Sequence, residues 1–352
     1  MRSLNIAVAG DRFMLPEVFR EEIERALPGG GSVRTLEFAW PDEPMHHGYA
    51  EGTGHPATEG LREFYGDPDA VAAFVADAEV FVTHLAPVSA AMLPRMPNLK
   101  LVAVSRGGPV NVDRAGLKEA GVRVVNTPAR NAGAVAEFTI GAILAETRLI
   151  RAGHEALRRG EWRGDLYRAD TTGTELSELT VGIVGYGAIG ARVAKLLKAF
   201  GCRLLVADPY VQLSAQDRAD GVEHVSLDAL LEHSDVVTLH ARVTPETTRF
   251  IDRAAFARMK PGATFVNTAR GPLVDYDALH DALASGHLRG AMLETFAVEP
   301  APPDWPLLKL PNVTLTPHIA GASTTTVRIA AAMIAEELRR FAAGEGPLNP
   351  VN

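Results

Sequence analysis

Short apolar runs alternate with amphipathic stretches along most of the chain. Apolar runs without polar alternation are typical of strands that are covered on both faces of a parallel sheet. Their alternation with helical patterns therefore predicts an α/β fold with a mostly parallel sheet. In the first third of the chain we predict one doubly wound domain, with strands at residues 4–9, 32–38, 79–83, 99–105 and 122–126 and helices at 16–27, 69–76 and 112–120.

A second series of strands begins near Thr180, after a long apolar helix that we predict over residues 135–150. Because this helix stands between the two series, we interpret it as a connector between two domains. A length of 352 residues suits two domains better than one. In the second series we expect strands at 180–184, 203–207, 235–240 and 263–269, followed by a last helix at 324–343.

Residues 40–66 break this alternation, since they show no apolar periodicity and contain several Gly and Pro. A loop of this length inside a compact domain is usually functional or partly disordered. It carries His46, His47 and His55, but their spacing matches no known pattern of metal ligands. We therefore predict no metal site and interpret the segment as a lid or a subunit-contact arm.

Composition and charge narrow the class of protein. An apolar fraction of 47% and a charged fraction of 22% exclude wholesale disorder. A formal net charge of -8 argues against a nucleic-acid partner. The single cysteine, Cys202, excludes a disulfide scaffold and is interpreted as a packed small hydrophobe. Without a signal-peptide core or a membrane-spanning run, we expect a soluble, cytoplasmic protein with no membrane partner.

A glycine-rich turn follows the apolar strand at 180–184. In Gly-x-Gly-x-x-Gly turns the first glycine, here Gly185, permits the tight turn, and the second, Gly187, lets the backbone approach a pyrophosphate. The third, Gly190, lets the helix pack closely on the strand. Ala188 and Ile189 open that helix, whose amino terminus offers N–H groups and partial positive charge to phosphates.

The next strand ends at Asp208, 18 residues after Gly190. At this distance a carboxylate binds the ribose hydroxyls of a dinucleotide. No Arg stands beside Asp208 to receive a 2′-phosphate, so NAD is favoured over NADP. The simpler alternative is an ordinary glycine turn followed by a surface Asp.

Three later segments at strand ends each carry one residue that the reduction of a 2-oxo acid requires. Arg270 can bind the substrate carboxylate or carbonyl oxygen as a fixed cation. His318 can donate a proton to the carbonyl oxygen, and Glu299 can orient that histidine. Taken singly, Arg270 could be a solvated surface cation, His318 a structural turn residue, and Glu299 the start of a loop.

Together with Gly160-Glu161-Trp162, Glu175-Leu176 and Thr244-Pro245-Glu246-Thr247, these motifs resemble the D-isomer-specific 2-hydroxyacid dehydrogenase family over nearly the whole chain. The resemblance implies that Arg270 binds substrate and that Glu299 and His318 form the acid/base pair. It also implies two doubly wound parallel-sheet domains. A flavodoxin-like substrate domain would comprise residues 1–130 and 322–352, and a Rossmann NAD-binding domain residues 131–321.

The resemblance implies a glycine-containing loop at 105–113 whose N–H groups bind the substrate carboxylate. This loop is about two residues shorter than is usual in the family, and Pro109 contributes no N–H. Glu294 stands where the family has Asp near the nicotinamide, and Arg242 stands where Pro is usual. The remaining predicted contacts are Arg106, Gly107, Gly108 and His84 for the substrate, and His240, Thr268, Ala269, Glu294 and Gly321 for the cofactor.

These features predict an NAD-dependent oxidoreductase (EC 1.1.1.-) that interconverts a 2-oxo acid and a D-2-hydroxy acid by hydride transfer. The resemblance further implies a homodimer. Glu299 disfavours formate oxidation, because formate dehydrogenases of the family carry Gln there. An alternative of another class is an NAD(H)-sensing, corepressor-like binding protein with vestigial activity. Which acid is used stays open, with a sugar acid or a hydroxypyruvate-like acid as our working hypothesis.

Overall fold

The computed structural model describes residues 2–40 and 54–352, which form two compact units. One unit runs to Asn131 and also includes Ala322–Asn352, and the other is Ala132–Gly321. Each unit contains one wholly parallel sheet, of five and seven strands respectively. The predicted α/β class with two parallel-sheet domains is confirmed.

The sheet of the first unit has the strand order β2-β1-β3-β4-β5. The chain leaves β1 for β2 on one side and then crosses back to β3 on the other, so β1 and β3 flank the point where the winding reverses. The strands are β1 (Leu4–Gly10), β2 (Gly31–Glu37), β3 (Val80–Thr83), β4 (Leu101–Val104) and β5 (Arg123–Asn126). The helices are α1 (Pro16–Ala26), α2 (Pro68–Val75), α3 (Arg114–Glu119) and α11 (Thr324–Ala343), with 3-10 helices η1 (Pro56–Thr58) and η2 (Ala90–Arg95).

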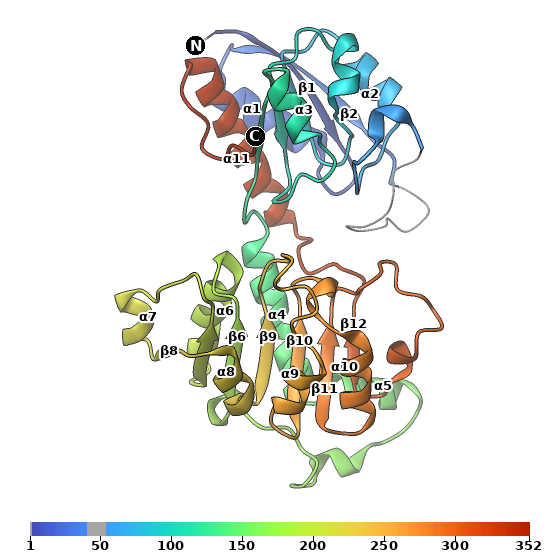
Figure 1. Cartoon of the computed structure of the whole chain (residues 1–352), viewed down its shortest axis with the longest axis vertical. Coiled ribbons are helices and arrows are strands. Elements are labelled where there is room, and N and C mark those ends of the chain that lie inside the picture. Colours follow the sequence, from blue (N-terminus) through green and yellow to red (C-terminus); the bar gives the residue numbers. More distant parts are fainter. Residues whose placement is uncertain (1, 41–53) are drawn as a thin grey trace. The chain divides into compact units, whose positions relative to one another are not determined.

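Both faces of this sheet are covered, as the uninterrupted apolar strands require. On one face Ile6 and Val8 pack with Ile334 of α11, which lies against α1 (Figure 1). Because successive strand residues point to opposite faces, Ala7 packs on the other side with Val71 of α2. The last helix therefore belongs to the core of the first unit.

The sheet of the second unit has the order β12-β11-β10-β9-β6-β7-β8 (Figure 1). The strands are β6 (Thr180–Val184), β7 (Arg203–Ala207), β8 (Val222–His224), β9 (Val236–Leu239), β10 (Ala263–Asn267), β11 (Leu288–Leu293) and β12 (Val313–Leu315). The helices are α4 (Ala132–Thr147), α5 (Ile150–Arg158), α6 (Ala188–Lys198), α7 (Ala215–Ala219), α8 (Leu227–His233), α9 (Arg253–Arg258) and α10 (Tyr276–Ala284). Short 3-10 helices are η3 (Gly164–Tyr167), η4 (Leu176–Glu178), η5 (Gly271–Leu273) and η6 (Pro306–Lys309).

The helix predicted over residues 135–150 corresponds to α4, which begins and ends three residues earlier. The chain forms two helices, α4 and α5, separated at Leu149, whose φ of 56° is left-handed. A continuous helix cannot pass through such a residue.

The predicted lid or arm at residues 40–66 is only partly described. His46 and His47 lie outside the described residues. His55 caps η1, since its Nδ1 accepts a hydrogen bond from Ala57 N at 3.1 Å. Within residues 2–40 and 54–352, no group of His, Cys, Asp and Glu is arranged to hold a metal ion. In the same residues, no helix is long and apolar enough to cross a membrane.

Candidate active site

Three neighbouring strands of the second unit bring the predicted catalytic residues to one edge of the sheet. Arg270 follows β10, Glu294 and Glu299 follow β11, and His318 follows β12. Since β12, β11 and β10 are adjacent and parallel, their carboxyl ends share one edge. Ligands of open α/β sheets bind at this edge.

Glu299 and His318 form a direct pair. The Nδ1 atom of His318 lies 2.7 Å from Oε2 of Glu299, and the other carboxylate oxygen accepts from Phe296 N at 2.8 Å. The side chains are 22% and 10% exposed respectively, so the pair is partly accessible. A carboxylate can only accept, so Nδ1 carries the proton and proton transfer falls to Nε2.

Glu294 holds the turn that carries His318, the predicted acid/base residue. Its backbone oxygen accepts from His318 N at 3.0 Å, and its side chain accepts from Ala320 N at 2.7 Å. This support matters because His318 has a left-handed φ of 54°. Burial raises the pKa of Glu294 to about 6, although the nearby charge of His318 and the N–H groups of Ala320 and Ile319 oppose the change.

Arg270 is exposed at the end of a braced turn. Its Nη1 donates to Ala269 O at 2.7 Å. The fully buried Asn267 donates to Arg270 O at 3.2 Å and accepts from Ala269 N at 3.0 Å. A Cβ on Gly271 would lie 1.8 Å from Phe296 O, so only glycine fits there. Sequence reasoning missed the bracing role of Asn267, although an amide at a strand end was visible.

The glycine turn fits the predicted dinucleotide. Gly185 has a φ of +92°, and a Cβ on Gly190 would lie 2.2 Å from Gly185 O, so both positions need glycine. A Cβ on Gly187 would meet no protein atom within 4 Å and would instead enter the space before α6. That space is where a phosphate can approach the helix N–H groups contributed by Ala188 and Ile189.

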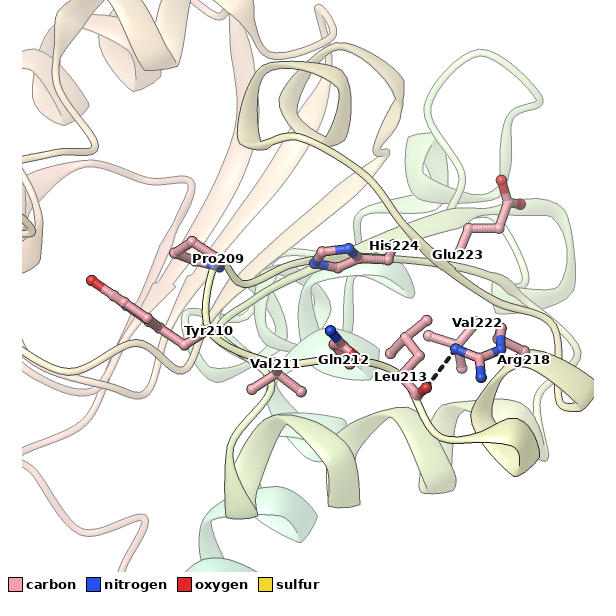
Figure 2. A pocket seen from close by; sticks show the side chains of 9 residues that line it. All are labelled: Pro209, Tyr210, Val211, Gln212, Leu213, Arg218, Val222, Glu223 and His224. Carbon is pink, nitrogen blue, oxygen red and sulfur yellow. Dashed lines mark hydrogen bonds between the residues drawn. The ribbon is translucent and has the colours of Figure 1, made fainter.

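Asp208 links the glycine turn to the end of β7. One carboxylate oxygen accepts from Tyr186 N at 2.7 Å and the other from Tyr210 N at 2.9 Å. Beyond Asp208 an open pocket of about 820 Å³ contains both Arg218 and His224 (Figure 2). The guanidinium of Arg218 donates to Leu213 O at 2.6 Å. The sequence showed no Arg beside Asp208, and tertiary structure brings this one to the same pocket.

The other predicted cofactor residues lie near the same sheet edge. His240 bonds Thr238 Oγ1 through Nε2 at 3.1 Å, and burial lowers its pKa to about 3. Its buried Nδ1 has no hydrogen-bond partner in the described part of the chain. Thr268 bonds Thr139 of α4 at 2.9 Å between hydroxyl oxygens. Ala269 is buried and Gly321 is half-buried.

The predicted substrate residues belong to the first unit, at the carboxyl ends of β3 and β4. Gly107 and Gly108 are exposed, and Gly107 O accepts from Asn126 Nδ2 at 2.8 Å. Arg106 forms an ion pair with Glu63 and donates to its backbone oxygen at 3.1 Å. His84 is buried and bonds Asp11. Sequence reasoning missed Asp11, because 73 residues separate it from its partner.

The fold and the glycine turn define a dinucleotide-binding α/β protein. Residues 140–320 match the family model for the D-isomer specific 2-hydroxyacid dehydrogenase, NAD binding domain. The chain is 36% identical over 343 residues to the glyoxylate reductase of Korarchaeum cryptofilum, covering 96% of both. It is 40% identical over 287 residues to the D-3-phosphoglycerate dehydrogenase of Mycobacterium tuberculosis strain H37Rv, covering 81% of this chain and 53% of that one.

The chain therefore spans about half the length of the phosphoglycerate dehydrogenases that it matches. The structure of D-2-hydroxyisocaproate dehydrogenase superposes with a TM-score of 0.78 at 26% identity, covering 98% of this chain and 99% of that one. The protein belongs to the D-isomer-specific 2-hydroxyacid dehydrogenase family. The predicted resemblance and an NAD-binding domain are confirmed, and the comparisons give no support to the corepressor-like alternative.

Proposed function

We propose that the protein catalyses the reversible, NAD(H)-dependent reduction of a 2-oxo acid to a D-2-hydroxy acid. The observation that carries this proposal is the His318–Glu299 pair, at 2.7 Å, on the same sheet edge as Arg270. A positioned imidazole with a carboxylate partner is the usual device for moving a proton in catalysis.

Each residue of this set has a distinct role in the proposed reaction. The dinucleotide, when bound, supplies or accepts the hydride at the carbon that bears the oxygen. Arg270 binds the carboxylate and the carbonyl oxygen of the substrate and stabilises negative charge on that oxygen. His318 delivers the proton to the same oxygen through Nε2, and Glu299 stabilises the charged imidazole. In the reverse direction His318 removes that proton.

We propose that Gly185, Gly187 and Gly190 hold the pyrophosphate and that Asp208 binds the adenosine ribose. The Asp208 carboxylate repels a 2′-phosphate, whereas Arg218 in the adjoining pocket could attract one. We expect NADH to bind about tenfold or more tightly than NADPH, and Asp208→Ala to narrow this ratio. Asp281→Asn, an exposed carboxylate on α10 between β10 and β11, is the matched control. Fluorescence titration measures the affinities of the wild type and both variants for each cofactor.

The names of the relatives leave the substrate open between 3-phosphoglycerate and glyoxylate. These acids share only the carboxylate and the neighbouring carbon. Arg270, at the carboxyl edge of the second sheet, would bind this shared part. We propose that the N–H groups of Gly107 and Gly108 also bind the carboxylate. Contact of Arg106 with the substrate would have to compete with its ion pair to Glu63.

The decisive experiment is an NADH-oxidation screen with 2-oxo acids of two to six carbons, with and without phosphate. We expect at least one acid to be reduced to the D-isomer, as chiral chromatography would show. Arg270→Met should lower kcat/KM by about 100-fold for every acid. Tight NADH binding without oxidation by any acid would instead favour the binding-protein alternative.

The homodimer implied by the resemblance, and a cytoplasmic location, stay predictions. The proposed contact lies on the NAD-binding unit and involves α4. Light scattering at micromolar concentration should then give twice the chain mass of 37.6 kDa. A monomeric mass would contradict the proposed dimer.

A further inference from the structure

A second histidine–carboxylate pair lies in the first unit, apart from the catalytic set. Asp11 directly follows β1 and His84 directly follows β3, the two strands that flank the reversal of winding in this sheet. In open α/β sheets such a switch point is the preferred place for a ligand. The proposed reaction gives this pair no role.

The contacts of Asp11 determine which ring nitrogen of His84 carries the proton. One oxygen of Asp11 accepts from Phe13 N and Met14 N, both at 2.8 Å, and the other lies 2.5 Å from His84 Nδ1. Burial alone would raise the pKa of Asp11, but its hydrogen bonds lower it overall. The ionised carboxylate can only accept, so Nδ1 carries the hydrogen.

His84 is therefore an acceptor at its other nitrogen. Burial lowers the pKa of His84, the charge of Arg130 lowers it further, and Asp11 only partly opposes this. The ring is neutral at neutral pH, and Nε2 keeps a lone pair. Across residues 2–40 and 54–352, no group donates a hydrogen bond to this nitrogen.

Arg130 lies close enough to this pair to interact electrostatically with both of its members. Its Cζ lies 6.0 Å from the ring centre of Phe13, and the ring of His84 lies 5.9 Å from the same ring. Burial lowers the pKa of Arg130 to about 10, which leaves it charged at neutral pH. Its buried Nε has no hydrogen-bond partner among the described residues. A ligand oxygen would satisfy a donor that is otherwise costly to bury.

We propose that His84 and Arg130 recognise a hydroxyl group on the tail of the substrate. The hydroxyl donates to His84 Nε2, and its oxygen accepts from Arg130. A phosphate or carboxylate oxygen has no hydrogen to offer and would face the lone pair of Nε2. This inference rests on the proposed function and narrows it to hydroxylated 2-oxo acids without an anionic tail.

The position of the pair also limits the length of the acid. The Gly107–Gly108 loop, which we propose binds the carboxylate, follows β4, and β4 is the neighbour of β3. Neighbouring strands lie about 4.8 Å apart. A hydroxyl one strand away from the carboxylate belongs to a short acid, of about three or four carbons.

Three acids test the inference: hydroxypyruvate, pyruvate, which lacks the hydroxyl, and phosphohydroxypyruvate, which replaces it with an anion. We expect kcat/KM for hydroxypyruvate to exceed that for each of the others by about tenfold or more. A higher value for phosphohydroxypyruvate than for hydroxypyruvate would overturn the inference.

Asp11→Asn exchanges the donor and the acceptor in the hydrogen bond between residue 11 and His84. The amide oxygen still accepts from Phe13 N and Met14 N, while the amide N–H₂ now faces Nδ1 and moves the ring hydrogen to Nε2. We expect the preference for hydroxypyruvate over phosphohydroxypyruvate to fall by about tenfold. The matched control is Asp67→Asn, which removes a carboxylate that caps α2 in the same unit without a histidine partner. A purely structural loss lowers all three rates together, so an unchanged ratio in Asp11→Asn overturns the inference.

Nitrogen NMR of the histidine rings separates this inference from the proposed function. Using His84→Gln to assign the signal, we expect a neutral ring with hydrogen on Nδ1, and a shift of Nε2 with D-glycerate but not with D-lactate. If this shift occurs and no acid oxidises NADH, the proposed function fails while the recognition of a hydroxyl stands. If acids are reduced but His84 is protonated near neutral pH, the inference fails while the function stands.

Discussion

The two units of this protein each place a histidine–carboxylate pair at the carboxyl edge of a parallel sheet. In both pairs the carboxylate bonds Nδ1, at 2.7 Å for His318–Glu299 and 2.5 Å for His84–Asp11. The surroundings differ. His318 is 22% exposed and has a second carboxylate, Glu294, beside it, whereas His84 is 9% exposed and has the cation Arg130 nearby.

This difference is the physical basis for proposing two roles for one arrangement. A nearby negative charge stabilises an imidazole that becomes positive during proton transfer, whereas burial and a nearby cation keep an imidazole neutral. The pair in the second unit therefore suits acid/base chemistry, and the pair in the first unit suits recognition by a fixed acceptor. The motif alone does not determine the role.

The largest expected effect comes from making the same substitution in both histidines. Glutamine cannot transfer the proton, so His318→Gln should lower kcat by about 100-fold or more with every acid. The loss in kcat of His84→Gln should be at least about tenfold smaller, because this substitution removes only a recognition contact. Steady-state assays at saturating NADH measure both variants. Equal losses in kcat would break the distinction between the two pairs.

Neutralising the two carboxylates should have an intermediate effect and a different pattern for each. Glu299→Gln removes the charge that stabilises the imidazolium and should lower kcat about tenfold or more for all acids alike. Asp11→Asn should instead redistribute activity among acids. The test measures kcat/KM of each variant for each acid. A selective change in Glu299→Gln, or a uniform one in Asp11→Asn, would contradict the assignment.

The smallest expected effect concerns Glu294 and the pH dependence of stability. Burial raises its pKa to about 6 from an ordinary 4.5, so the folded protein holds this proton more tightly than the unfolded chain does. The stability that the protonated carboxyl contributes is present at low pH. It is lost as the pH rises through the folded pKa, at a cost of roughly 2 kcal/mol.

Gln at position 294 avoids this cost while its oxygen still accepts from Ala320 N. We therefore expect the difference in unfolding free energy, Glu294→Gln minus wild type, to be larger at about pH 7.5 than at about pH 4.5. Urea unfolding at the two pH values measures it. The control Asp67→Asn should show no such change. A difference in unfolding free energy that does not depend on pH would contradict the conclusion that burial disfavours the ionised form of Glu294.

Local signals account for the features that the sequence predicted well. The turn from Gly185 to Gly190 was predicted because each glycine has a local backbone reason, and two of these reasons are visible as a positive φ and a close approach. The strands of both sheets were visible because buried parallel strands are short, uninterrupted apolar runs. The strands β8, β11 and β12 were not among the predicted ranges; β8 and β12 have only three residues each, and so short a run leaves no pattern.

Long-range contacts account for what was missed. Arg130, beyond β5, interacts electrostatically with Asp11 and His84, which follow two other strands. No periodicity or spacing encodes such encounters, because they depend on strand order.

The sequence by itself determined the α/β class and the dinucleotide turn, and it predicted the catalytic set, because these follow from local backbone geometry and from residue types at strand ends. Only the tertiary structure decided which side chains share an environment. Glu294 accepts a hydrogen bond from the turn after His318, Asp11 bonds and orients His84, and Asn267 donates to the backbone oxygen of Arg270. The physical reason is that burial and neighbouring charge set the protonation of a histidine, and both are properties of the packed sheet edge.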